Sequence, residues 1–189
     1  MKEIRFTNWW ACKKKEQSIS NTLAQLDLYN KTEYSKNKLI DPELLERAAK
    51  FAHDNQLVYF VTIFENEIPY CYLEIDNGFY RVNFLDENIR LYMSYDFRDD
   101  FSSGEPNKLF LSNVTFWDFE GNTDKVLKIT SHIFKPNGTF HITERDRITN
   151  EQIDSEAKNK IDVSQNWEEY PKFGDYDLLT RKERKATIN

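Results

Sequence analysis

The sequence predicts an α+β fold in which one helix precedes a seven-stranded antiparallel meander. Three observations support it: apolar residues recur at helical spacing over 41–55, they alternate over 57–145, and Asp, Asn and Gly fill short turns between successive strands. With 189 residues, 39% hydrophobic and 15% aromatic, the chain has the means to fill the core of one domain, 1–189. The pattern does not decide whether the sheet is flat or strongly curved.

Residues 1–40 have the weakest pattern. Lys2–Trp10 alternates in part, as a first strand would. A helical face then follows, with Ser18 or Ser20 as a candidate N-cap. The residues of this face are Ile19, Leu23, Leu26 and Tyr29.

Residues 41–55 give the clearest helix. Asp41 is a suitable N-cap, and Pro42 suits the first helical position because its missing N–H costs nothing there. His53 lies near the helix end, where a cation suits the helix dipole. The apolar stripe consists of Leu44, Leu45, Ala48, Phe51 and Ala52.

The meander follows the helix. Strands are expected at residues 57–64, 69–75, 79–85, 88–97, 108–119, 125–134 and 139–144. Asp76-Asn77-Gly78 and Pro136-Asn137-Gly138 are typical hairpin turns, and consecutive strands joined in this way are antiparallel neighbours. The 98–107 connection alone is long, and long loops often carry function.

Residues 146–189 form a C-terminal tail. Thr149–Lys160 is polar and predicts a short helix or a loop. Four aromatic residues then come close together, and leaving them in water is costly, so we expect this tail to pack back on the sheet. They are Trp167, Tyr170, Phe173 and Tyr176.

Several classes of protein are excluded. No apolar run is long enough to span a membrane, and the N-terminus lacks a signal-peptide core. Cys12 and Cys71 form no CxxC pair, which favours a reducing cytoplasm. The net charge is −6 and the bases are scattered, which argues against nucleic acid as a partner.

No motif for catalysis, a cofactor or a metal is present, so we predict none of these sites and no enzyme. A three-residue loop between Lys135 and Thr139 would turn His132 and His141 to opposite faces, which disfavours a two-histidine metal site. Cys71 falls on an apolar strand face, where a thiol is inert.

The negative charge is concentrated in residues 65–120, which hold 12 acids against 4 bases, a net of −8. Because turns of a meander alternate between its two ends, the turns at 65–67, 85–88 and 120–124 should share a first end. The connections at 76–78, 98–106 and 135–138 should share a second end. Lys125 is the base expected near the first end, whose acids are Glu65, Glu67, Asp86, Glu87, Glu120 and Asp124.

These acids have three interpretations. Turns are often acidic because acids are well solvated, which needs no function. A surface complementary to a basic partner is the second interpretation, and a divalent-cation site is the third, although no DxDxDG loop is present. The second interpretation predicts these partner-binding residues: Glu65, Glu67, Asp86, Glu87, Asp99, Asp100, Phe101, Glu105, Trp117 and Glu120.

Four short stretches are of a familiar type, and they are Gly78–Phe84, Asn107–Ser112, Phe116–Phe119, and the tail with Trp167 and Pro171–Tyr176. In these stretches the chain resembles the small immunity proteins that accompany bacterial polymorphic or contact-dependent toxins. The resemblance implies a cytoplasmic, non-catalytic α+β protein that binds and neutralises a cognate toxin. It transfers no site residue to this chain.

Two alternatives remain open. A small-ligand or enzymatic module would hold an aromatic pocket between sheet and helix, with Tyr, His and carboxylate side chains facing inward, around His132 or His141. A structural protein would pair through uncovered sheet edges, and the oligomeric state is not decided by the sequence.

Overall fold

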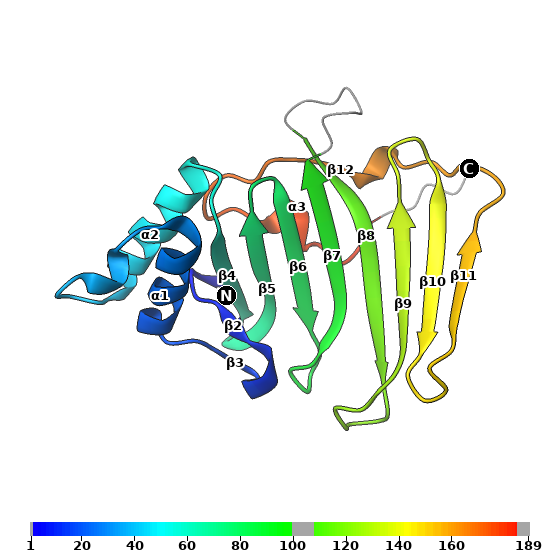
Figure 1. Cartoon of the computed structure of the whole chain (residues 1–189), viewed down its shortest axis with the longest axis horizontal. Coiled ribbons are helices and arrows are strands. Elements are labelled where there is room, and N and C mark those ends of the chain that lie inside the picture. The colour runs from blue at the N-terminus through cyan, green and yellow to red at the C-terminus, as the bar shows by residue number, and fades with distance from the viewer. Residues whose placement is uncertain (1, 100–107, 185–189) are drawn as a thin grey trace.

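The computed structural model describes residues 2–99 and 108–184. Within them, ten strands form one open antiparallel sheet, in the order β1-β4-β5-β6-β7-β8-β9-β10-β11, with β12 paired to β8 (Figure 1). The strands are β1 (Lys2–Arg5), β4 (Tyr59–Glu65), β5 (Ile68–Asp76), β6 (Phe79–Leu85), β7 (Leu91–Asp99), β8 (Lys108–Phe119), β9 (Val126–Phe134), β10 (Phe140–Asp146), β11 (Gln152–Glu156) and β12 (Trp167–Glu169). A separate two-stranded sheet joins β2 (Trp9–Trp10) and β3 (Lys15–Glu16).

Both predicted helices form. Helix α1 (Ile19–Asn30) is capped by Ser18, whose hydroxyl accepts a hydrogen bond from the Asn21 N–H. Helix α2 (Pro42–Asp54) is capped by Asp41, which accepts from the Leu44 N–H at 2.8 Å. A short helix, α3 (Asp177–Thr180), lies in the tail, and single 3₁₀ turns lie at Ala11–Lys13, Tyr34–Lys36 and Ser164–Asn166. None of the helices in the described residues is long and apolar enough to cross a membrane.

The predicted meander is confirmed as β4 to β10, but the predicted number of seven strands is wrong. Strand β1 pairs with β4, about sixty residues further along the chain, so no local turn indicates the pairing. Strand β11 lies within the segment expected to be a helix or loop, and its five side chains are all exposed, so it has no apolar alternation. Strand β12 has three residues, too few for a readable period.

The two faces of the sheet are covered differently. One face, here called the tail face, packs against the C-terminal residues 167–184, which lie behind the sheet in Figure 1. Tyr176 and Leu179 are buried there, and the Arg184 guanidinium lies 5.2 Å from the Tyr95 ring and 4.9 Å from the Phe97 ring. Buried Glu168 accepts from Arg184 at 2.6 Å and also from Arg181, which anchors the tail. The expectation that the tail packs on the sheet is therefore confirmed.

The opposite face is covered near β4 and β5 by the N-terminal segment. Trp9 stacks on Tyr72 with ring centroids 5.9 Å apart, and Tyr29 of α1 meets Phe60. From β6 onward this face carries a polar row instead. Arg81 donates to Asp96 through both Nε and Nη2, at 2.7 and 3.1 Å.

A bulge in β5 moves one side chain to the other face. Ile63 pairs with Cys71, but Phe64 pairs with Pro69, so Tyr70 is an extra residue. Its hydroxyl consequently reaches the tail and donates to the Thr180 carbonyl at 2.8 Å. Simple alternation would have placed Tyr70 on the face opposite Cys71.

Candidate functional site

The turns divide between two ends of the sheet as the meander requires (Figure 1). The β4–β5, β6–β7 and β8–β9 turns share the first end. The β5–β6 and β9–β10 turns, together with the end of β7, share the second. Of the predicted partner-binding residues, those at the first end are therefore brought to one side of the molecule. Asp100, Phe101 and Glu105 lie outside the described residues.

Asp86 organises the β6–β7 turn. Its carboxylate accepts from the N–H groups of Asn88 and Arg90, at 2.9 and 2.8 Å, and from the Arg90 Nε at 2.8 Å. Burial by itself raises the pKa of Asp86, but these hydrogen bonds and the positive charge of Arg90 outweigh it, so the pKa lies below its ordinary 3.8. This carboxylate is a structural group whose hydrogen-bonding capacity is used within the chain.

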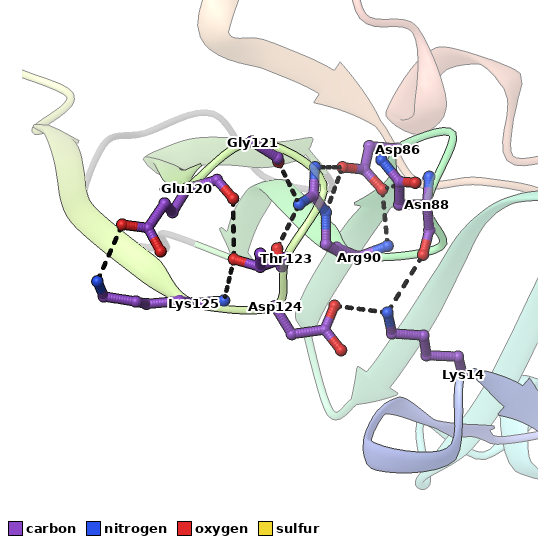
Figure 2. A network of polar contacts seen from close by, with 9 residues as sticks. All are labelled: Lys14, Asp86, Asn88, Arg90, Glu120, Gly121, Thr123, Asp124 and Lys125. Carbon is purple, nitrogen blue, oxygen red and sulfur yellow. Dashed lines mark hydrogen bonds and ion pairs between the residues drawn. The ribbon is translucent and has the colours of Figure 1, made fainter.

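Arg90 joins two turns (Figure 2). Its Nη1 donates to the carbonyls of Gly121 and Thr123 in the β8–β9 turn, at 2.8 and 2.5 Å. The guanidinium also lies over the Phe119 ring, 4.3 Å from its centroid. Its side chain is only 10% exposed, so the bridge is shielded from water. Arg90 consequently ties the β6–β7 and β8–β9 turns of the first end to each other.

Two lysines complete this network (Figure 2). Lys14, from the N-terminal segment, contacts Asp124 at 2.5 Å and the Asn88 carbonyl at 3.4 Å. Lys125 pairs with Glu120 at 3.0 Å. The prediction that Lys125 is the base of this end is therefore incomplete. Arg90 falls within the strand predicted at 88–97 rather than in a turn, and Lys14 comes from a part of the chain far away in sequence.

Three of the predicted acids remain free at this end. Glu65, Glu67 and Glu87 are exposed, and none forms an ion pair with another described residue. Glu67 has φ of 68° and Asn66 has φ of 50°, the conformation of a tight hairpin turn in which glycine is preferred at the second position. Holding glutamate there costs about 1 kcal/mol or more.

The remaining predicted partner-binding residues, Trp117 and Asp99, do not belong to the exposed acids of the first end. Trp117 is half-buried within β8, two residues before the strand ends at the first end. Asp99 lies at the second end, where it accepts a hydrogen bond from the Tyr170 hydroxyl at 2.5 Å. The two predicted ends are therefore separate sites, and Asp99 belongs to the tail contact.

A cavity of about 550 Å³ opens beside Asp99, between the end of α2, the β5–β6 turn and the tail. His53 Nδ1 and the Tyr59 hydroxyl are 2.8 Å apart in its wall, and Tyr80 and Tyr170 also line it. Burial lowers the pKa of His53 below its ordinary 6.5 and raises that of Tyr80 to about 12. Burial thus opposes the cationic form of His53, against the role expected from its place on the helix. Sequence reasoning missed this site, because its members come from distant segments.

The other two histidines, His132 and His141, lie on neighbouring strands but do not face each other. His132 pairs with Ile142 and His141 pairs with Ile133, so the two imidazoles face opposite sides, as the three-residue loop predicts. His132 packs between Phe116 and Phe140. Within residues 2–99 and 108–184, no three His, Cys, Asp or Glu side chains gather as metal ligands would. Cys71 is fully buried, and burial raises the pKa of its thiol.

No protein-family model, no curated protein and no solved structure matches this chain.

Proposed function

We propose that this protein is a cytoplasmic, non-enzymatic binding protein of the immunity type, which neutralises a cognate protein toxin by covering a basic surface of that toxin. The binding surface is the first end of the sheet, where Glu65, Glu67 and Glu87 are exposed. One observation carries the proposal: exposed carboxylates without an ion pair to a described residue gather on neighbouring turns of one end, and Arg90 and Lys14 link the turn of Glu87 to the β8–β9 turn beside it.

The linkage between the β6–β7 and β8–β9 turns favours binding for a physical reason. Ordering loops on association costs free energy, and a surface that is already rigid avoids that cost. Complementary charge accelerates the encounter and fixes the register of the complex. The other acids of this end, such as Asp86, contribute rigidity, because their partners lie within the chain.

The test is a triple charge reversal, Glu65→Lys, Glu67→Lys and Glu87→Lys, with a matched control that reverses Glu43 of α2, Glu156 at the far end of β11 and Glu183 of the tail, which are also exposed. Each chain is immobilised and exposed to lysate of the source cell, and the captured protein is purified and expressed alone. We expect the captured protein to arrest growth and the wild-type chain to restore it. We expect the first variant to associate about tenfold more slowly, with a flatter salt dependence, and the control to bind normally.

Two outcomes contradict the proposal. Equal association rates for the two triple variants would remove the first end from the mechanism. A captured protein that is harmless when expressed alone would remove the immunity role.

The second candidate is a small-ligand or enzymatic module, favoured by the cavity at the second end. It lies between sheet and helix, and tyrosine, histidine and carboxylate side chains line it. Screening small metabolites for thermal stabilisation of the chain tests this candidate. A stabilising compound should lose its effect in Tyr80→Phe and keep it in Tyr29→Phe, since Tyr29 lies on α1 outside the cavity.

A further inference from the structure

A second hollow, of about 610 Å³, opens between β1 and α2. The chain lines it with five consecutive residues, Glu3 to Thr7, and α2 contributes Pro42, Leu45 and Glu46. Successive residues of a strand point to opposite faces of a sheet. Glu3, Ile4 and Arg5 belong to β1, and Phe6 and Thr7 continue the chain beyond it. A hollow that touches all three strand residues borders the edge of the strand, and it forms a groove along that edge.

The backbone at this edge is free. Strand β1 is the last strand on its side of the sheet and pairs with β4. Among the described residues, the main-chain groups of residues 2–6 bond to no segment other than β4. In an edge strand, alternate N–H and C=O groups point away from the sheet and can pair with a further strand. The residues that carry those groups, Glu3 to Arg5, line the groove.

The floor of the groove is apolar. Phe6 stacks on Phe173 of the tail, with centroids 4.4 Å apart and planes 6° from parallel. Ile4, Ile19 and Leu45 add to this floor. The Thr7 hydroxyl beside them is buried and has no hydrogen-bond partner among the described residues. The floor has the chemistry to receive an apolar side chain.

The margin of the groove is acidic. Arg5 is already paired with Glu3 at 2.8 Å and with Glu16 at 2.6 Å. Glu46 stands exposed on the helix side and forms no ion pair with a described residue. The lining thus holds three carboxylates and one base, a net of −2. A basic residue next to the apolar one would match this charge.

We propose that this groove binds an extended peptide as a strand added to β1, with an apolar side chain on the Phe6–Phe173 floor and a lysine or arginine facing Glu46. Three residues of β1 and the two that follow it line the groove, so the occupant is a segment of about five residues. Main-chain hydrogen bonds would supply affinity, and the apolar floor would supply specificity, as in other grooves between a strand edge and a helix. The proposal does not depend on the toxin-binding role of the first end.

The experiment begins with a display library of random octapeptides screened against the full chain. We expect the enriched peptides to share an apolar residue and a nearby Lys or Arg. Each is then labelled, and its dissociation constant is measured by fluorescence anisotropy. Methylation of single backbone amides should weaken binding about tenfold at alternate positions, because those amides pair with β1, and little at the positions between.

Glu46→Gln should raise the dissociation constant of the basic peptides severalfold. Glu33→Gln, a change at an exposed residue outside the groove, should leave that constant unchanged. Circular dichroism and urea midpoints check that both variants are folded. Three results overturn the proposal: no enriched peptide, N-methyl effects without alternation, or equal affinity for the wild type and Glu46→Gln. A dimer in sedimentation that masks the groove also overturns it, because the occupant is then a second copy of the chain.

Discussion

The β6–β7 and β4–β5 turns lie at the same end of the sheet and are both acidic, yet they use their acids in opposite ways. In the first, Asp86 is surrounded by donors and tied to Arg90. In the second, Glu65 and Glu67 point into solvent without an ion pair to a described residue. The first turn forms a brace, by which we mean Asp86 and Arg90 with the carbonyls of Gly121 and Thr123. The second turn instead presents exposed carboxylates, although the same type of charge builds both turns.

The comparison shows why regional charge is a weak guide to a binding surface. Of the acids in residues 65–120, Asp96 is buried and paired with Arg81, and Asp99 bonds Tyr170. Asp86 belongs to the brace. The count that suggested one strongly negative surface thus includes several groups satisfied inside the molecule, and the exposed remainder is smaller.

The largest effect is expected from Arg90→Ala. This change removes the charged partner of Asp86 and two hydrogen bonds to carbonyls of the neighbouring turn. It also leaves the largely buried Asp86 carboxylate without its guanidinium. We expect the free energy of unfolding to fall by about 2–3 kcal/mol. Urea denaturation followed by tryptophan fluorescence measures it.

The control for this change is Arg98→Ala, at an exposed position of the second end. It should cost less than about 0.5 kcal/mol. Equal losses for the two variants would show that the brace adds nothing to stability.

Asp86→Asn gives a smaller effect that depends on pH. The folded chain holds the pKa of Asp86 below 3.8, so on acidification the unfolded chain takes up the proton first. The stability that this group supplies is present above about pH 4 and is lost as the pH falls through the folded pKa. At pH 7 the variant should lose about 1–2 kcal/mol.

Urea midpoints between neutral pH and about pH 2 test this linkage. The gap between wild type and Asp86→Asn should narrow steadily toward the acid limit. A gap that stays constant across this range would mean that the carboxylate charge is not what stabilises the turn.

Glu67→Gly should act in the opposite direction on the β4–β5 turn. Glycine tolerates the positive φ that glutamate is forced to adopt, so we expect a gain of about 0.5–1 kcal/mol in the free energy of unfolding. Thermal unfolding measures the gain. The same variant should bind the partner more weakly, and a gain in both stability and affinity would separate Glu67 from the proposed surface.

The smallest effect belongs to Glu87→Gln. The side chain is exposed and forms no ion pair with a described residue, so stability should stay within about 0.5 kcal/mol of wild type. A larger loss, measured by the same urea titration, would place Glu87 in the brace with Asp86.

Local sequence pattern is sufficient to predict much of the fold but little of the candidate site. Capping residues such as Ser18 and Asp41 mark the helices, and alternation with tight turns marks β4 to β10. Strand β11 is exposed on both faces, so its residues carry no apolar period. The contacts that define the site, Lys14 with Asp124 and His53 with Tyr59, join segments that only the folded chain brings together.

The covering of the tail face has a consequence for synthesis of the chain. Strands β4 to β7, which build much of this face, end at Asp99, while Tyr176, Leu179 and Arg184, which cover it, leave the ribosome about eighty residues later. Until then the rings of Tyr80, Phe84 and Phe97 lack the cover that buries them in the finished protein. A chain that stops before residue 167 would keep that apolar face open, and such chains are natural substrates for chaperones and for aggregation.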